Sequence, residues 1–530
     1  MSLRIGIDVG GTNTDAVLMD DLTVISKIKT PTTVDVTGGI TTALKHVLES
    51  SGTATGQIAG VMVGTTHFTN AVVERRRLQP TAIVRLGLPA TKALPPFVDW
   101  PDDLADMLGR HAYLCHGGYE FDGRMISPLD LDELQRVADD ITARGLTAIA
   151  ISCVFSPVNT DMEQQAAEFF ANAVPGASVT ISSEIGRIGL LERENAAILN
   201  ACLRQLARQT VEAFRQSIAE TGISAPLYIT QNDGTLMSAD FAEQYPVLTF
   251  ASGPTNSMRG AAFLSGLKDA MVVDIGGTTS DVGALTHGFP REASVAVDIG
   301  GVRTNFRMPD VYSFGLGGGS LVQADPLKIG PRSVGYRITE EARVFGGETL
   351  TTTDIAVASG SADIGDASRV ADLDPALVAT AMARIKEMIE SAVDRMKTSA
   401  EPIPVIVVGG GSILVSFDVA GASELVKPPH FEAANAVGAA IGQISGEVDR
   451  VYSLEGRSRN EAIDDARAEA TEKAVAAGAE PTTVQIVDVE DVPLTYLPGN
   501  ATRIRVKAVG DLALQGPCRQ HSWDRNERTP

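Results

Sequence analysis

Two short segments of this sequence combine aspartate, paired glycines and hydroxyl side chains, which are residue types that can bind phosphate. The first runs from Asp8 to Asp15 and the second from Asp274 to Asp281. A glycine pair removes side-chain bulk and leaves backbone N–H groups exposed, while neighbouring hydroxyls add further donors. An aspartate at the end of a strand can also hold the water shell of Mg²⁺. Each segment, taken alone, predicts either a phosphate-binding turn or an ordinary tight hairpin.

The second segment repeats the first, with aspartate, two glycines, threonine and another aspartate in the same order and at the same spacing. The copies lie about half the chain apart, which indicates a duplication of whole domains rather than a short solenoid repeat. Unrelated hairpins rarely share a polar signature of this kind. The repetition therefore favours phosphate binding over the ordinary hairpin, and two facing turns could hold one triphosphate.

Two further glycine-rich segments could belong to the same site. Gly409-Gly410-Gly411-Ser412 follows an apolar strand at residues 405–408, and bare backbone there would allow an adenine or ribose to approach closely. A strand-to-helix turn in a doubly wound sheet is an equal interpretation of this segment. Residues 315–320 predict either a conformational loop or a loop on the substrate side.

Other nucleotide and hydrolase motifs are absent from the sequence. It has no GxxxxGK[ST] P-loop, and residues 315–320 end in serine where a dinucleotide fingerprint has glycine. HExxH and GxSxG are also missing, so no motif supports zinc-peptidase or serine-esterase chemistry. His111, Cys115 and His116 have a metal-like spacing, but no second ligand cluster lies nearby, so we interpret them as loop or packing residues.

An α/β fold must position these glycine segments. Residues 4–18 predict a hairpin around the first glycine pair, and residues 61–66 predict a strand. Residues 146–155 are apolar throughout, as in a parallel sheet that is covered on both faces. Residues 161–173 and 191–220 predict the covering helices. Strands that alternate with helices in this way indicate the α/β class.

Length and composition limit the class of protein. A chain of 530 residues exceeds one core, and we predict domains at residues 1–250 and 251–448 and a small α+β module at 449–530. Hydrophobic residues make up 44%, which excludes a disordered chain. The net charge of −22 argues against binding to nucleic acid or anionic lipid. The absence of CxxC pairs and of any apolar run of roughly 18 residues predicts a cytoplasmic protein without a membrane span.

Several motifs resemble, in order, those of the hydantoinase A and 5-oxoprolinase family. They are residues 64–75, Glu192-Arg193, Asn200-Ala201, residues 231–238, Ser252-Gly253-Pro254 and residues 317–320. The resemblance covers about residues 1–445, and it is specific because half a dozen motifs fall in sequence. It is a resemblance within the superfamily of sugar kinases, actin and heat-shock chaperone ATPases.

The resemblance implies duplicated ribonuclease H-like (actin-like ATPase) domains with a small C-terminal α+β module. It also implies a hydrolase that uses ATP and Mg²⁺ to open a cyclic amide such as a hydantoin, 5-oxoproline or a lactam. The γ-phosphate would pass to the amide oxygen, because phosphorylation gives a poor electrophile a leaving group before water attacks. A hydantoinase B-type subunit or further copies of this chain, in a homo-oligomer, are the implied protein partners.

The family's site residues can be carried onto matching positions. The resemblance implies a first phosphate loop of Asp8, Gly10, Gly11, Thr12 and Asn13, a second of Asp274, Gly276, Gly277, Thr278 and Thr279, and a nucleoside loop that includes Gly409, Gly410 and Ser412. Asp8 and Asp274 would organise Mg²⁺, and one of them would orient the attacking group. The implied substrate residues are Thr65, Thr66, Asn70, Ser252 and Gly253.

Two departures from the family pattern bear on function. Thr255-Asn256-Ser257 stands where many members have a small-residue pair, which predicts a more polar local surface and a different substrate. Many members also run longer or work with a second, B-type subunit. Two alternatives use the same fold: a partner-activating, chaperone-like ATPase that responds to a protein, and a small-molecule kinase that leaves a stable phosphorylated product.

Overall fold

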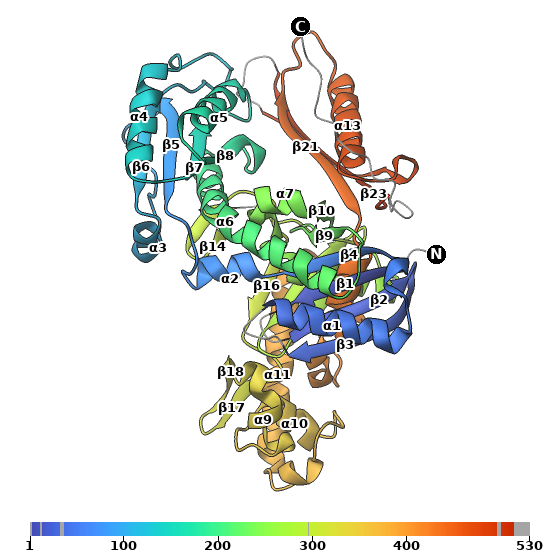
Figure 1. Cartoon of the computed structure of the whole chain (residues 1–530). Helices are drawn as coiled ribbons and strands as arrows, with labels where there is room; N and C mark the ends of the chain where they lie inside the picture. Colours follow the sequence, from blue (N-terminus) through green and yellow to red (C-terminus); the bar gives the residue numbers. More distant parts are fainter. Residues whose placement is uncertain (1–2, 11–12, 32–35, 295, 495–499, 514–530) are drawn as a thin grey trace.

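The computed structural model describes residues 3–10, 13–31, 36–294, 296–494 and 500–513. The chain forms two central sheets, each with an inserted subdomain (Figure 1). The N-terminal sheet lies in the middle of the molecule, a parallel α/β subdomain and the C-terminal strands lie above it, and a smaller subdomain lies below.

The first central sheet has nine strands in the order β22-β23-β21-β10-β9-β4-β1-β2-β3. They are β1 (Leu3–Val9), β2 (Asn13–Asp20), β3 (Thr23–Pro31), β4 (Ile58–Thr65), β9 (Leu227–Thr230), β10 (Leu236–Ser238), β21 (Ile444–Tyr452), β22 (Gln485–Pro493) and β23 (Thr502–Gly510). Helices α1 (Val36–Ser51) and α6 (Leu190–Glu220) cover one face, and their apolar side chains form a buried core with β1, β2 and β4. The alternation of residues along β1 and β4 sends every second side chain into this core.

The second central sheet has six strands in the order β13-β12-β11-β19-β20, with β16 paired to β12. They are β11 (Ala270–Ile275), β12 (Ser280–Thr286), β13 (Phe289–Pro290), β16 (Val311–Phe314), β19 (Ile403–Val408) and β20 (Ala422–Val426). The long helix α11 (Pro375–Met396) packs on one face through a stripe of apolar residues. The stripe follows the 3.6-residue period of a helix with one buried side.

The two sheets confirm the predicted duplication. In the first sheet β1 pairs antiparallel with β2 and parallel with β4, and Asp8 lies opposite Asp15. In the second, β11 pairs antiparallel with β12 and parallel with β19, and Asp274 lies opposite Asp281. β3 and β16 occupy equivalent places outside the two hairpins. The conserved spacing of the two glycine segments therefore corresponds to the same strand register.

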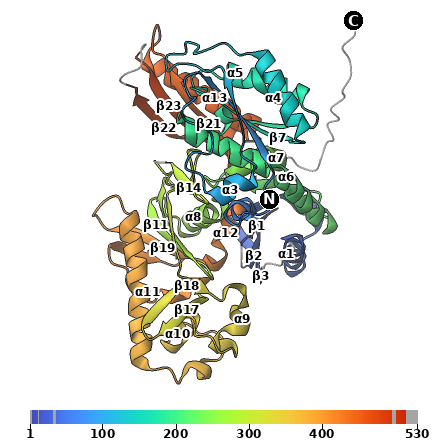
Figure 2. The same ribbon diagram turned by 90° about the vertical axis from the view of Figure 1, so that its left-hand side faces the viewer.

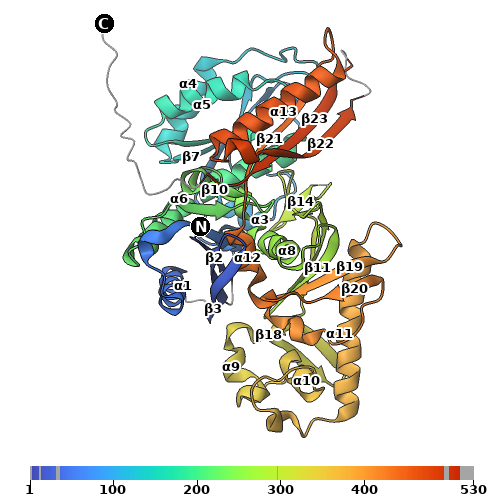
Figure 3. The same ribbon diagram turned by 90° about the vertical axis from the view of Figure 1, so that its right-hand side faces the viewer.

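Helices α8 (Ser252–Ser265) and α12 (Ala434–Ala440) lie side by side between the two sheets (Figures 2 and 3). Their backbones approach so closely that a Cβ atom at Gly260 would lie 1.8 Å from the carbonyl oxygen of Ala434. A Cβ atom at Gly438 would lie 1.9 Å from the carbonyl oxygen of Asn256. Only glycine permits this contact, which brings polar residues of both helices to the junction of the sheets.

Two insertions flank this frame. The upper one is a parallel sheet with the order β6-β5-β7-β8, and the lower one carries a hairpin and short helices. The upper insertion contains β5 (Thr81–Leu88), α3 (Asp102–Met107), β6 (His111–His116), α4 (Leu131–Ala143), β7 (Ala148–Cys153), α5 (Asp161–Ala173) and β8 (Ser178–Ile181). The lower insertion contains β17 (Ser320–Ala324), β18 (Leu327–Ser333), α9 (Ile338–Glu341) and α10 (Thr352–Ala358). The apolar segment around β7 thus lies in a parallel sheet, as predicted.

The C-terminal strands extend the first sheet. β21 crosses the predicted boundary at residue 448 and pairs with β10, while α13 (Arg459–Ala476) covers β21 and β23. Asp233, within the motif at residues 231–238, forms buried ion pairs with Lys507 (2.7 Å) and Arg307 (3.0 Å). Burial alone would raise the pKa of Asp233, but these two cations hold it well below its usual range. The predicted small module is therefore continuous with the first sheet, although independent folding of the three predicted domains stays a prediction.

Among the helices that the structure describes, none combines the length and the apolar character that crossing a membrane requires.

Candidate functional site

The two glycine turns close their hairpins in the same way. The amide of Gly10 donates to the carbonyl of Asn13 (3.0 Å), and the amide of Gly276 donates to the carbonyl of Thr279 (2.9 Å). Gly11 and Thr12, which we predicted to contact phosphate, lie outside the described residues. In the second turn the amides of Gly277 and Thr278 have no hydrogen-bond acceptor among the described residues. Such amides are available to an anion.

Side-chain amides hold the first aspartate. Asn256 Nδ2 donates to Asp8 Oδ1 (3.3 Å), and Asn435 Nδ2 donates both to Asp8 Oδ2 (3.0 Å) and to Asp15 Oδ2 (2.9 Å). Lys29 Nζ forms an ion pair with Asp15 (2.8 Å). The first hairpin thus has two nearly buried carboxylates that share the Asn435 amide donor, and one of them, Asp15, is paired with a lysine.

The electrostatics of Asp8 reflect this burial. Burial raises the pKa of Asp8 to about 6, and the neighbouring Asp15 adds to the rise. The amide hydrogen bonds from Asn256 and Asn435 oppose the rise because they stabilise the ionised form. The negative charge of Asp274, in the second half, also raises the pKa of Asp8.

Hydroxyl groups, rather than amides, hold the second pair of aspartates. Asp274 accepts a hydrogen bond from Ser257, and Asp281 accepts one from Ser313. Burial raises the pKa of Asp274 above its usual value and raises the pKa of Asp281 to about 6. The positive charge of Lys29 lowers the pKa of Asp274, so this lysine of the first half also acts on the second.

One helix therefore contacts both predicted metal-binding aspartates. Asn256 of α8 donates to Asp8, and the next residue, Ser257, donates to Asp274. We had predicted that Thr255-Asn256-Ser257 makes the local surface more polar, and this was wrong: the exposed fractions of the three residues are 0%, 0% and 3%. They are buried because α8 lies between the two sheets, where Thr255 Oγ1 donates to the Ala251 carbonyl (2.8 Å) and Asn256 Nδ2 donates to Thr230 Oγ1 (3.1 Å).

The loop at residues 315–320 packs directly on the second glycine turn. The amides of Gly318 and Gly319 donate to the carbonyls of Gly276 (3.0 Å) and Gly277 (2.8 Å). A Cβ atom at Gly317 would lie 2.5 Å from the backbone nitrogen of Thr278. Thr353 of α10 donates to the Gly318 carbonyl (2.8 Å), which ties the lower subdomain to this loop. The sequence left the role of the loop open, and the structure places it against the predicted phosphate turn.

The predicted nucleoside loop converges on the same place. Gly409 has a φ of +85°, and a Cβ atom there would lie 2.2 Å from Asp274 Oδ1. Nothing lies within 4 Å of a Cβ position at Gly410, which leaves open space beside the loop. The hydroxyl of Ser412 is buried and has no hydrogen-bond partner among the described residues. Three glycine segments therefore meet around Asp274.

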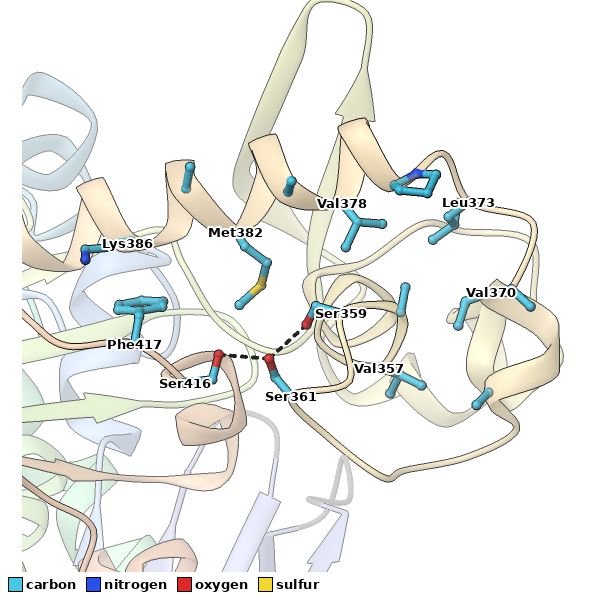
Figure 4. Close-up of a pocket in the computed structure, with 16 residues that line it drawn as sticks. Val357, Ser359, Ser361, Val370, Leu373, Val378, Met382, Lys386, Ser416 and Phe417 are labelled. Atoms are coloured by element: carbon cyan, nitrogen blue, oxygen red, sulfur yellow. Dashed lines mark hydrogen bonds between the residues drawn. The ribbon is translucent and has the colours of Figure 1, made fainter.

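A cavity of about 800 Å³ lies beyond these loops (Figure 4). The end of α10, the first half of α11 and the segment after Ser412 enclose it. Val357, Met382 and Phe417 give it apolar walls, and Lys386 Nζ lies 5.6 Å from the centre of the Phe417 ring. At one side the hydroxyls of Ser359, Ser361 and Ser416 form a chain with distances of 2.8 Å.

The five predicted substrate residues lie together where β4 meets α2 (His67–Val73) and α8. The Thr65 amide donates to Ser252 Oγ (3.2 Å), and Ser252 Oγ donates to the Thr65 carbonyl (2.9 Å). Both residues are buried, so this exchange fixes the backbone of the junction. Thr66 and Gly253 are partly exposed and Asn70 is exposed. The substrate role stays a prediction, and these three residues are the ones that a substrate could reach from solvent.

Four polar residues of this site escaped the sequence analysis: Lys29, Asn256, Ser257 and Asn435. The sequence does contain Asn256 and Ser257 in a polar run after Ser252-Gly253-Pro254, but a sequence pattern of this kind does not indicate that the residues are buried. Asn435 stands in a run of alanines and glycine that gives no sign of a polar contact. Among the described residues no group of three His, Cys, Asp or Glu side chains is arranged to hold a metal.

Comparison with known proteins gives matches over most of the chain. The family model for the hydantoinase/oxoprolinase N-terminal region matches residues 4–174, and the hydantoinase/oxoprolinase model matches residues 193–396. The caprolactamase subunit alpha of Pseudomonas jessenii is 28% identical over 381 residues, which are 67% of this chain and 54% of that protein. The acetone carboxylase beta subunit of Xanthobacter autotrophicus is 27% identical over 386 residues, 66% of this chain and 53% of that protein. The chain thus spans about half the length of these relatives.

Two solved structures share the fold. The ATP-dependent caprolactamase from Pseudomonas jessenii aligns with a TM-score of 0.77 at 20% identity, covering 97% of this chain and 88% of that one. The nucleotide-free acetone carboxylase aligns with a TM-score of 0.69 at 18% identity, with the same coverages of 97% and 88%.

Proposed function

This chain belongs to the hydantoinase/oxoprolinase family, and from that premise we propose that it uses ATP to activate a carbonyl oxygen of a cyclic amide. The substrate class would be a hydantoin, 5-oxoproline or a lactam. The observation that carries the proposal is the meeting of three glycine segments around Asp274, within electrostatic range of Asp8. An arrangement of bare backbone amides beside two buried carboxylates suits a polyphosphate and a divalent cation.

The proposed reaction follows from the chemistry of the amide. An unstrained amide is a poor electrophile, so transfer of the γ-phosphoryl group to its oxygen creates a leaving group. Water then adds to the carbon, and the C–N bond breaks with protonation of the nitrogen, which leaves an acyl phosphate. A second water attacks the acyl carbon, and phosphate departs with the former amide oxygen. The products are the ring-opened amino acid, ADP and phosphate.

The residues of the chain have separate proposed tasks. The turn amides of Gly277 and Thr278 would bind phosphate oxygens. The hydrogen bonds from Gly276 to Thr279 and from Gly10 to Asn13 would keep the two turns in shape around the phosphates. Asp8 and Asp274 would hold Mg²⁺, which supplies charge neutralisation to the phosphate oxygens when bound. The amides of Asn256 and Asn435 orient Asp8, and the Ser257 hydroxyl orients Asp274. Thr66, Asn70 and Gly253 would face the amide.

The nucleoside would extend from Gly409, Gly410 and Ser412 toward the cavity at Phe417. At the start of helix α10 the hydroxyls of Thr352 and Thr353 donate hydrogen bonds to the backbone carbonyls of residues 317 and 318. The other end of the helix forms part of the cavity wall. The seven residues of α10 span about 10 Å at 1.5 Å per residue, which is the separation between the loop and the cavity wall along this helix. The apolar walls and serine chain suit an aromatic heterocycle with polar edges.

A second candidate has a specific observation in its favour. The acetone carboxylase beta subunit matches this chain about as well as the caprolactamase subunit does. A ketone could therefore replace the cyclic amide as the carbonyl compound, and carboxylation could replace hydrolysis.

The experiment that tests the proposal uses the purified full chain with MgATP, alone and with a hydantoinase B-type subunit from the same source. Hydantoin, 5-oxoproline and caprolactam form one arm, and acetone or acetophenone with bicarbonate forms the other. We expect ADP release together with a ring-opened acid, identified by mass spectrometry. With ¹⁸O in the amide carbonyl, the label should appear in the released phosphate.

The possible outcomes separate the candidates. Turnover only in the ketone arm would replace hydrolysis by carboxylation, and a stable phosphorylated product would indicate a kinase. ATPase activity that responds to a protein but to no carbonyl compound would indicate a partner-activating ATPase. Ring opening without ¹⁸O transfer would contradict phosphorylation of the amide oxygen.

A further inference from the structure

The site contains four aspartates but little positive charge. Asp8, Asp15, Asp274 and Asp281 occupy the two hairpins in equivalent pairs. Among the described residues, Lys29 is the only cation that forms an ion pair with any of them. A triphosphate entering this site would add further negative charge, which makes the position of that cation decisive.

Lys29 marks a difference between the duplicated halves. It lies on β3 directly opposite Asp15 of β2. The equivalent place in the second half is Ser313 on β16, directly opposite Asp281 of β12. The duplicated register thus positions a lysine against the first hairpin and a neutral hydroxyl against the second.

The ion pair is arranged so that the lysine can leave it. The Lys29 side chain is 39% exposed, whereas that of Asp15 is 4% exposed. Asn435 Nδ2 would continue to donate to Asp15 Oδ2 (2.9 Å) if Lys29 moved away. The charge of Lys29 also acts on Asp274, at the base of the second turn. Its flexible ammonium group lies beside the first predicted metal-binding carboxylate, because Asn435 donates to both Asp15 and Asp8.

We propose that Lys29 rests on Asp15 in the nucleotide-free chain and binds the terminal phosphate of ATP when nucleotide enters. The inference rests on the proposed use of ATP. It assigns to Lys29 the discrimination between ATP and ADP, because ADP lacks the phosphate that the ammonium would contact. No bond is made or broken by this residue; it positions the transferred group and balances its charge.

Lys27 provides a matched control on the same strand. It lies two residues before Lys29, so it projects from the same face of β3, and it also forms an ion pair, with Glu432. Its side chain is 37% exposed, close to the value for Lys29. A Lys27→Met variant therefore removes a similarly exposed, paired lysine from the same strand, two residues farther from the end of β3.

The test measures binding of AMP-PNP and of ADP, each with Mg²⁺, to the full chain by calorimetry. Lys29→Met should weaken AMP-PNP binding by about 10- to 100-fold, the range for a lost charged hydrogen bond, and change ADP binding by less than about threefold. Lys27→Met should change neither, and Lys29→Arg should recover part of the AMP-PNP affinity. Circular dichroism and thermal unfolding establish that each variant folds.

The outcomes distinguish this inference from the proposed function. If the unmodified chain binds neither nucleotide, the proposed use of ATP fails, and the role of Lys29 falls with it. If it binds both and Lys29→Met affects both equally or neither, the inference is overturned while the proposed function stands. Should Lys29→Met fail to fold, Lys29→Gln and Lys29→Arg decide by the same AMP-PNP to ADP ratio, and an unchanged ratio in both overturns the inference.

Discussion

The two glycine hairpins share a strand register but differ in what surrounds them. In the first, the amides of Asn256 and Asn435 and the ammonium of Lys29 hold Asp8 and Asp15. In the second, hydroxyl groups hold the aspartates, and the loop at residues 315–320 packs on the turn. Duplication thus supplied the same backbone geometry twice, and the two halves differ in their side chains. We infer that the first half contributes charged side chains to the site, whereas the second half contributes backbone amides.

The largest effect should come from the second aspartate. Asp274→Asn should abolish ATP turnover and leave nucleotide affinity within about tenfold, because it removes metal organisation rather than the nucleoside contacts. The Ser257 hydroxyl can accept a hydrogen bond instead of donating one, so the fold should tolerate the amide. Steady-state ADP release and calorimetry check this. Retained turnover would remove Asp274 from the machinery, and loss of folding would make the hairpin structural.

The loop contact on the second turn should be the next most sensitive feature. In Gly317→Ala the added Cβ would lie 2.5 Å from the backbone of Gly277 and Thr278, which cannot move aside as a side chain would. We expect ATP turnover to fall by about 100-fold or more with a lower melting temperature, since a misplaced phosphate site loses its orientation. Gly56→Ala, where nothing lies within 4 Å, is the stability control. Normal turnover in Gly317→Ala would separate this loop from the site.

The two neighbouring polar residues of α8 allow the halves to be compared within one helix. Asn256→Leu leaves Asp8 Oδ1 without its amide donor and should destabilise the fold by about 1–3 kcal/mol. It should also raise the pKa of Asp8 further and move the acidic limb of the kcat/KM profile to higher pH. Ser257→Ala removes the hydroxyl group beside Asp274 instead. If the pKa of Asp8 determines the acidic limb of the profile, this variant should shift the limb less than Asn256→Leu does. Equal shifts in both variants would mean that the aspartates titrate as one unit.

The last prediction concerns the pH dependence of stability, which we expect to change without loss of activity at the first hairpin. Burial raises the pKa of Asp281 from 3.8 to about 6, so the folded state keeps this proton to higher pH than the unfolded state does. Stability from this group is therefore lost as pH rises from about 4 to about 6. Asp281→Asn has no buried carboxyl to ionise. Its free energy of unfolding relative to the unmodified chain should therefore rise between about pH 4 and pH 6 by up to about 3 kcal/mol, and solvent screening reduces this value.

Denaturant unfolding at several pH values measures this difference. Ser313→Ala is the informative control, because loss of the hydroxyl donor should raise the pKa of Asp281 and steepen the pH dependence. A difference between Asp281→Asn and the unmodified chain that does not change between about pH 4 and 7 would contradict the shift.

Sequence reasoning reached the fold class, the duplication and the family, and it also selected most of the glycines that meet around Asp274. It misjudged Thr255-Asn256-Ser257 because polarity normally indicates exposure. It also divided the chain at residue 448, within a strand, since a change in composition does not reveal which sheet a strand joins. The predicted metal, nucleotide and substrate roles of individual residues stay predictions.

What the sequence determined by itself is local: within each eight-residue segment, the spacing of aspartates and glycines sets the turn and the strand register. What only the tertiary structure decided is which donors meet each carboxylate. Asn256 is 248 residues from Asp8 in the chain, and Asn435 is 427 residues from it. Contacts of that range depend on the packing of α8 against α12, where glycines permit the helices to touch, and no local pattern encodes the pairing.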